Sequence, residues 1–145
     1  MKITEIKPTD DELRVILEIG FALRIVKRLD EAAEVFQGVA QLLPEADVPR
    51  VALATIDIDR GRFVEAQTAC EEALRLHPES LYARVHRAEA LLLQRRRVEA
   101  EAELNAIVSA DPQSAHSRTA KALLKAAELM FSEGELEASA SFGRS

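Results

Sequence analysis

Apolar and polar residues alternate along the first third of the chain with the spacing of an amphipathic helix. Between residues 13 and 26, apolar and small residues lie three or four positions apart and share one helix face: Leu13, Ile16, Leu17, Gly20, Leu23 and Val26. Thr9 followed by Glu12 is a capping-box pattern, which indicates a helix start next to this stretch. A second apolar stripe covers residues 30–42, and Pro44 cannot continue that helix. The pattern predicts two helices joined by a short turn.

The same pattern recurs along the chain with a period of 34 residues. Proline, alanine and small residues keep this period in separate registers: Pro44, Pro78 and Pro112; Ala32, Ala66 and Ala100; Gly20, Ala54, Ala88 and Ala122. Because each register keeps one kind of side chain, the period indicates helix hairpins that bury their apolar faces against one another. We expect helices near these residues: 13–26, 30–42, 48–60, 64–76, 81–94 and 98–110.

This repeat resembles the motif of the tetratricopeptide repeat family. The best copy spans residues 47–80 and contains Ala54, Ala66, Ala73 and Pro78 at the family's small-residue and proline positions. The resemblance implies an all-α fold, an α-solenoid of three tetratricopeptide helix hairpins with a C-terminal capping helix. It divides the chain as follows: an N-terminal arm (1–12), a single domain (13–131) with repeats 13–46, 47–80 and 81–114 and a capping helix 115–131, and a tail (132–145) that we expect to be disordered.

Composition restricts the function of this chain more than its fold. Apolar residues make up 48% of the 145 residues and aromatic residues only 4%, so the core must be built from Leu, Val, Ile and Ala. A net charge of −6 argues against nucleic-acid binding, which needs a basic surface. The single cysteine fits a reducing compartment. Because no apolar run approaches about 18 residues and no signal-peptide pattern is present, we expect a cytoplasmic protein that does not insert into membranes.

The stretch TACEEALRLHP, residues 68–78, raises the question of catalytic or metal-binding chemistry. Cys70 and His77 lie seven residues apart and would share one face of a helix. Cys70, however, has the register of Phe36 and Leu104, which is a core position, and His77 precedes the proline of a turn. A zinc site needs three or four converging ligands, and no such spacing exists in the sequence. We therefore expect no enzymatic activity, no catalytic residue, no metal and no cofactor.

Arginine occupies a register in which the family motif has a large aromatic residue. Arg50, Arg84 and Arg118 repeat with the period and would form a ladder along one side of the solenoid. Two interpretations remain open for them. Either their stems pack in place of the aromatic residue while the guanidinium reaches water, or the guanidinium groups pair with carboxylates of adjacent helices or contact a partner. The run Arg95–Arg97 falls in an inter-helix turn, where it complements a helix C-terminus or forms a patch for an acidic partner.

The family resemblance implies that the first helices of the hairpins line a concave groove that binds a partner. Carried over to this sequence, the lining positions are mostly apolar, and we expect these to form the binding site: Leu17, Phe21, Ile25, Val48, Val51, Ile58, Tyr82, Val85, Leu92 and Leu123. An exposed apolar strip of this size suits the apolar face of an amphipathic helix. The alternative is that these side chains collapse onto one another and leave an ordinary surface.

Two functions from different classes follow from this interpretation. The chain is similar to the small tetratricopeptide chaperones of bacterial type III secretion, which implies a chaperone that holds a helical secretion subunit before export. The alternative is a structural scaffold or oligomerisation module within a larger assembly. Both functions require a protein partner, and the second also allows a homo-oligomer. The sequence identifies neither the client nor the oligomeric state.

Overall fold

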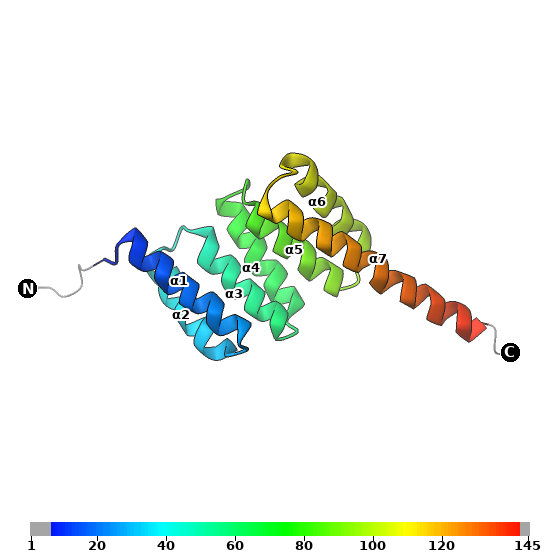
Figure 1. Ribbon diagram of the computed structural model, residues 1–145, viewed down its shortest axis with the longest axis horizontal. Coiled ribbons are helices and arrows are strands. Elements are labelled where there is room, and N and C mark those ends of the chain that lie inside the picture. The colour runs from blue at the N-terminus through cyan, green and yellow to red at the C-terminus, as the bar shows by residue number, and fades with distance from the viewer. Residues whose placement is uncertain (1–6, 143–145) are drawn as a thin grey trace, which may run out of the picture.

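The computed structural model describes residues 7–142, and its side chains are described as far as residue 132. Within this part the chain is entirely helical, with no strand, and the helices follow one another along a solenoid (Figure 1). They have these bounds: α1 Asp10–Ile25, α2 Leu29–Leu42, α3 Asp47–Asp59, α4 Phe63–Leu76, α5 Leu81–Leu93, α6 Arg97–Ala110 and α7 Ala115–Phe142. The order of three hairpins and a last helix confirms the predicted fold class.

Helix α1 begins earlier than the apolar pattern predicted. Thr9 is its N-cap residue, and the Thr9 hydroxyl accepts a hydrogen bond from the Glu12 amide at 3.2 Å. The Glu12 carboxylate in turn accepts from the Thr9 amide at 2.9 Å, which completes the expected capping box. Residues 10–12, which we assigned to an N-terminal arm, therefore form the first turn of α1. Residues 1–6 of that arm lie outside the described residues.

The turn inside each hairpin contains one residue in the left-handed region. Lys27, Gly61 and Arg95 have φ angles of 66°, 78° and 65°, and they are separated by the period of the repeat. In each turn, the amide of the following residue donates to a carbonyl five positions earlier, at 2.8–3.0 Å. This bond closes the C-terminus of the first helix and reverses the chain. Glycine meets the conformational demand without strain only in the second repeat.

Three apolar clusters form a continuous core along the solenoid. The first joins α2 to α3 around Phe36 and Ile56, and the second joins α3, α4 and α5 around Cys70. The third joins α5, α6 and α7 around Leu91 and Leu104. Each cluster thus connects one hairpin to the first helix of the next, because a single hairpin cannot bury both of its faces.

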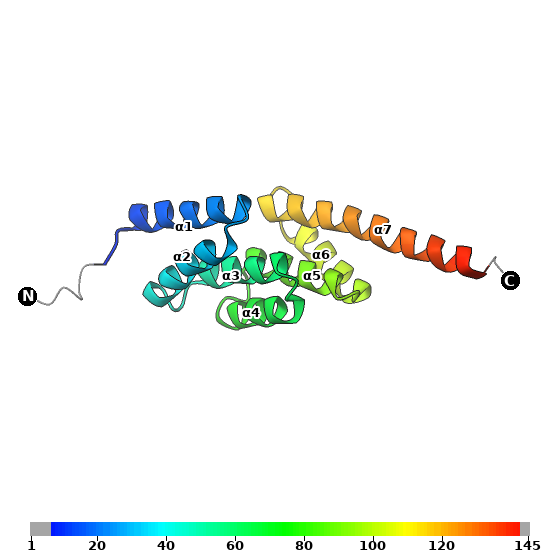
Figure 2. The same cartoon turned by 90° about the horizontal axis from the view of Figure 1, so that it is seen from below.

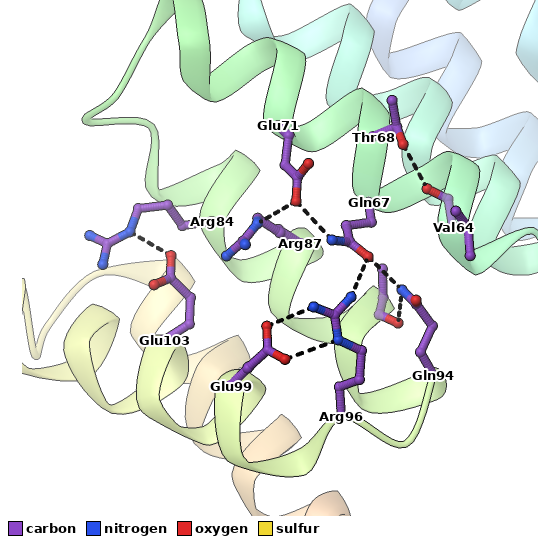
Figure 3. A network of polar contacts seen from close by, with 11 residues as sticks. Val64, Gln67, Thr68, Glu71, Arg84, Arg87, Gln94, Arg96, Glu99 and Glu103 are labelled. Atoms are coloured by element: carbon purple, nitrogen blue, oxygen red, sulfur yellow. Dashed lines mark hydrogen bonds and ion pairs between the residues drawn. The ribbon is translucent and has the colours of Figure 1, made fainter.

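A polar network fixes the second repeat against the third (Figure 3). The Glu71 carboxylate on α4 accepts hydrogen bonds from Gln67 at 2.8 Å and from Arg87 on α5 at 3.1 Å. Gln67 Oε1 accepts from Gln94 at 2.8 Å and from Arg96 at 3.2 Å. The hydrogen bond from Gln67 lowers the pKa of Glu71, with a smaller contribution from Arg87. Glu71 is therefore an ionised structural acceptor between repeats.

Helix α7 covers the last hairpin and continues beyond it. The Ser114 hydroxyl accepts from the Ser117 amide at 3.0 Å, as expected for an N-cap. Phe131 packs where α7 passes the α5–α6 turn, with Arg95 and Arg97 at 5.8 and 4.9 Å from its ring centroid. The helix then projects away from the other helices (Figure 1) and ends at Phe142, past the end we expected for the capping helix. Residues 143–145 of the expected tail lie outside the described residues.

Candidate protein-binding face

The first helices of the hairpins, together with α7, form one face of the solenoid. Figure 2 shows α1 and α7 on the same side of α3 and α5, while α4 lies on the opposite side. We call the surface formed by α1, α3, α5 and α7 the first-helix face. It is the surface to which the family resemblance assigns partner binding.

Four of the ten predicted lining residues lie in the core instead of on this face. Val51, Val85 and Leu92 are 0%, 1% and 2% exposed, and Ile58 is 9% exposed. Val51 and Ile58 belong to the middle cluster, and Val85 and Leu92 belong to the cluster under α7. The prediction is corrected for these four, because neighbouring helices of the solenoid cover them and no partner can reach them.

The other six predicted residues keep some accessible surface. Ile25 is 76% exposed, and the remaining five are half-buried: Leu17, Phe21, Val48, Tyr82 and Leu123. The Phe21 ring lies against the Phe36 ring of α2, with centroids 5.0 Å apart. The accessible apolar surface is therefore smaller than expected, and its most exposed part lies on α1.

A cluster of aromatic rings lies on the part of the first-helix face formed by α5 and α7. The Tyr82 ring of α5 contacts His86 edge-on at 5.0 Å between centroids and His116 of α7 at 5.9 Å. Burial raises the pKa of Tyr82 to about 12, so its phenol is protonated at neutral pH. His86 Nδ1 lies 2.8 Å from a Glu89 carboxylate oxygen. This part of the face offers ring surface and a carboxylate.

An ion pair that the sequence pattern did not predict joins the first two repeats. Arg24 of α1 donates to both carboxylate oxygens of Asp59 on α3, at 2.7 and 3.1 Å. The two side chains are 29% and 14% exposed. A two-bond guanidinium–carboxylate pair neutralises the cation and fixes its direction. The clue in the sequence was that an arginine and an aspartate occupy lining positions of consecutive repeats.

The residues of TACEEALRLHP have structural positions. Cys70 is fully buried, and burial raises the pKa of its thiol to about 12, so it is not a nucleophile at neutral pH. His77 is the C-cap residue of α4, where a hydrogen bond with the Glu45 carbonyl raises its pKa. Among the described residues, no three His, Cys, Asp or Glu side chains are close enough to hold a metal ion. None of the described helices is both long and apolar enough to cross a membrane.

Two arginines of the ladder, Arg84 and Arg50, have different hydrogen-bond partners. Arg84 of α5 donates to Glu103 of α6 at 2.8 Å, which is the carboxylate pairing. In the preceding repeat the register of Glu103 holds Ala69, which offers Arg50 no carboxylate. Arg50 donates instead to the Pro44 carbonyl at 2.8 Å. Its Nε is buried without a partner. The same register therefore has different surroundings in consecutive repeats.

Comparison with known proteins agrees with this fold. Residues 57–124 match the tetratricopeptide repeat family model, and no curated protein sequence matches the chain. The matched part runs from the end of α3 into α7, so it includes the third hairpin in full. The resemblance to tetratricopeptide repeat proteins, predicted from the 34-residue period, is confirmed.

Three solved structures illustrate the fold. The first TPR domain of human RPAP3 has a TM-score of 0.70 and 19% identity, covering 85% of this chain and 94% of that one. The type III secretion translocator chaperone SycD of Yersinia enterocolitica has a TM-score of 0.68 and 21% identity, covering 84% of this chain and 96% of that one. PcrH from Pseudomonas aeruginosa has a TM-score of 0.67 and 20% identity, covering 88% of this chain and 99% of that one. At these identities the likeness establishes the α-solenoid fold.

Three of the similar structures contain peptides or segments of other proteins. The first TPR domain of Spaghetti (RPAP3) was bound to the HSP90 peptide SRMEEVD, SycD to a peptide of the translocator YopD, and PcrH to the chaperone-binding region of PopD. These are therefore protein-binding solenoids with different kinds of partner segment.

Proposed function

We propose that this chain binds a segment of another protein on its first-helix face and acts as a cytoplasmic chaperone for a type III secretion subunit. The observation that carries the proposal is an accessible apolar row on α1. Leu17, Phe21 and Ile25 are spaced by four residues, and Ile25 is 76% exposed. Such a row fits the apolar side of an amphipathic helix from a partner.

The charges of the face favour an apolar segment over an acidic one. The first TPR domain of Spaghetti (RPAP3) was bound to the acidic peptide SRMEEVD. In this chain, Asp59 neutralises Arg24, and Glu89 adds a carboxylate beside Tyr82. An acidic segment would therefore meet no free cation at Arg24. This supports a client of the kind that SycD holds, a segment of a translocator.

A structural scaffold is the second candidate function. It is favoured by one observation, the apolar side chains that α1 exposes outside the first-helix face. Val15 and Ile19 are each half exposed. A scaffold of this kind would associate through its end helix, and charges placed on the first-helix face would leave its assembly intact.

The experiment compares two exposed positions on different faces. Ile25→Glu places a charge on the first-helix face, and Val98→Glu places the same charge on α6, where Val98 is 82% exposed. With the gene's own operon neighbours co-expressed, we expect a secretion subunit to co-purify with the wild type and Val98→Glu but not with Ile25→Glu. Val85 is unsuitable for this test because a charge there would enter the core.

Circular dichroism must show the same helical content in both variants. Retention of the subunit by Ile25→Glu, at wild-type yield, would reject binding on the first-helix face. Self-association that is unchanged in the same variant would instead favour the scaffold, and light scattering measures that directly.

A further inference from the structure

Charge is divided between the two long edges of the solenoid. The turns inside the three hairpins, residues 26–28, 60–62 and 94–96, lie along one edge, and the loops between repeats lie along the other (Figure 1). The turns contain six cations and no acid: Lys27, Arg28, Arg60, Arg62, Arg95 and Arg96. The loops contain acids and no lysine or arginine: Glu45 in 43–46, Glu79 in 77–80 and Asp111 in 111–114. We call the three turns the hairpin-turn edge.

The local structure of the turns does not require these cations. Each turn lies between the C-terminus of one helix and the N-terminus of the next, so its cations meet opposite ends of two helix dipoles, and the two interactions offset each other. Arg28, Arg62 and Arg96 are the N-cap residues of α2, α4 and α6, where arginine has no acceptor and makes no side-chain capping bond. Thr9 and Ser80, by contrast, accept capping bonds at the starts of α1 and α5. The basic turns therefore indicate a role outside the fold.

Each turn has one cation that forms no ion pair with another described residue. The other three cations are paired within the chain: Arg28 with Glu31, Arg60 with Asp30 and Arg96 with Glu99. Among residues 7–132, Lys27, Arg62 and Arg95 take part in no ion pair, and all three are exposed. Arg95 lies 5.8 Å from the ring centroid of Phe131, which leaves its charge in place. The edge thus presents one cation in each repeat to a carboxylate from outside.

An open hollow between the first two turns is wide enough for an acidic side chain. Its volume is about 310 Å³, and these residues line it: Lys27, Arg28, Leu29, Asp30, Glu31 and Arg60. Three cations and two carboxylates meet there, and both carboxylates are already paired. The ammonium group of Lys27 is therefore the charge in excess, and a carboxylate that enters the hollow finds a charged donor without having to break an existing pair.

The composition of the edge favours an acidic protein segment over a membrane or a nucleic acid. Val26 is the one apolar residue among the nine residues of the turns, whereas binding to a membrane surface needs large apolar side chains that insert below the headgroups. Asp30, Glu31 and Glu99 lie in the first turns of α2 and α6, so a uniformly charged phosphate surface would be repelled beside each cation. Separate carboxylates on a protein segment meet the cations alone.

We propose that the hairpin-turn edge binds an acidic segment of a second partner protein. One carboxylate of the segment enters the hollow beside Lys27, and others pair with Arg62 and Arg95. The site is separate from the first-helix face, where Asp59 already neutralises Arg24. The chain therefore holds a client and an acidic partner at the same time.

The first test reverses the three unpaired cations of the edge. The probe is a fluorescein-labelled peptide that alternates glutamate with alanine, and fluorescence anisotropy measures its dissociation constant. Changing Lys27, Arg62 and Arg95 together to Glu should weaken binding by about tenfold or more, because each reversal replaces an attraction by a repulsion. The matched control changes three exposed cations elsewhere that also form no ion pair among the described residues: Lys7, Arg118 and Lys121, each to Glu.

The two variants differ in the place of the new charges and not in their number. Three reversals of two charges each change the net charge from −6 to −12 in both. In about 0.15 M salt, where the Debye length is about 8 Å, the control should stay within about threefold of the wild type. Equal losses in the two variants, or a wild type that does not bind the peptide, would overturn the proposal. Circular dichroism checks folding, and Lys27→Gln alone, with an expected loss of about threefold, replaces the triple variant if that variant unfolds.

The second test separates the acidic segment from a membrane and from the client. In sedimentation with phosphatidylglycerol vesicles the wild type should stay in solution, as it should with phosphatidylcholine vesicles. Sedimentation with the phosphatidylglycerol vesicles that the triple edge variant loses would mean that the edge binds a membrane, and would reject the proposal. The peptide should also bind to the purified client complex without displacing the client. Displacement would place the acidic segment on the first-helix face, whereas a chain that binds the peptide and holds no client would reject the proposed function alone.

Discussion

The ring of Phe36 occupies the space that a side chain on Gly20 would need. A Cβ built on Gly20 of α1 would lie 2.6 Å from Phe36 Cε1 and 2.8 Å from Cζ. Phe36 is fully buried, so its ring has no free direction in which to move. In the next repeats the same pair of registers holds Ala54 with Cys70 and Ala88 with Leu104. The largest second-helix residue thus faces the smallest first-helix residue.

Gly20→Ala should destabilise the protein although alanine favours helix. We expect a net loss of up to about 2 kcal/mol, because overpacking costs about 1–3 kcal/mol and the helix-propensity gain offsets about 1 kcal/mol of it. Urea denaturation followed by circular dichroism measures the change. Phe36→Leu in the Gly20→Ala background should cost less than Phe36→Leu alone, because it recreates the Ala88–Leu104 pair. Additive losses would show that the two residues do not share one space.

Introducing glycine at Lys27 and removing it at Gly61 should change the free energy of unfolding in opposite directions. Lys27→Gly should raise the free energy of unfolding by about 0.5–1 kcal/mol, because lysine is strained at a φ of 66°. Gly61→Ala, at a φ of 78°, should lower it by about 1 kcal/mol or more. Nothing lies within 4 Å of an added Cβ at Gly61, so backbone strain alone would cause the loss. Thermal unfolding of both variants checks the sign, and a stable Gly61→Ala would contradict the account.

The helices could be predicted from the sequence because their signals are local. The capping box at Thr9 and Glu12, the prolines, and the apolar spacing all act within one or two turns. The left-handed conformation of Lys27 and Arg95 was not predictable in this way. Of the three turn residues, only Gly61 is of a type that favours the left-handed conformation. The other two turns share this conformation because they occupy the same position in the repeat.

The binding face was predicted less well because burial on it depends on contacts between repeats. Val51 and Ile25 both occupy lining positions, yet Val51 is 0% and Ile25 is 76% exposed. Val51 has hairpins on both sides, whereas Ile25 ends a terminal helix. The pairing of Arg24 with Asp59 likewise joins residues 35 positions apart. Such relationships follow from how the solenoid stacks, which a repeat motif alone does not specify.

Arg50 and Arg84 should respond differently to the same substitution. Arg84→Met should lower the free energy of unfolding by about 1–2 kcal/mol, because it leaves the 20%-exposed Glu103 carboxylate without its partner. Arg50→Met should change it by less than about 0.5 kcal/mol, because methionine keeps the stem, and removal of a buried Nε without a partner offsets loss of the exposed hydrogen bond to the Pro44 carbonyl. Chemical denaturation of the two variants measures the difference. Equal losses would mean that the stems, not the guanidinium groups, decide stability at this register.

Cys70 should make the fold sensitive to alkaline pH. Burial raises the pKa of its thiol from an ordinary value near 9 to about 12. Below pH 9 the thiol is protonated in both states, and its contribution to stability is fully present. Between pH 9 and 12 the unfolded chain releases this proton and the folded chain keeps it, so the free energy of unfolding falls as pH rises. The limiting slope for one proton is about 1.4 kcal/mol per pH unit.

Cys70→Val isolates this contribution from the other groups that titrate at high pH. Valine fills the core position without a proton, so the free energy of unfolding of this variant should fall less steeply between pH 9 and 12 than that of the wild type. Tyr82, whose pKa burial also raises to about 12, provides the comparison, since Tyr82→Phe should flatten the curve only above about pH 10. Urea titrations at a series of pH values measure all three proteins. Parallel curves for wild type and Cys70→Val would mean that the thiol is exposed to solvent in the folded state, and a thiol reagent would then react with it without unfolding.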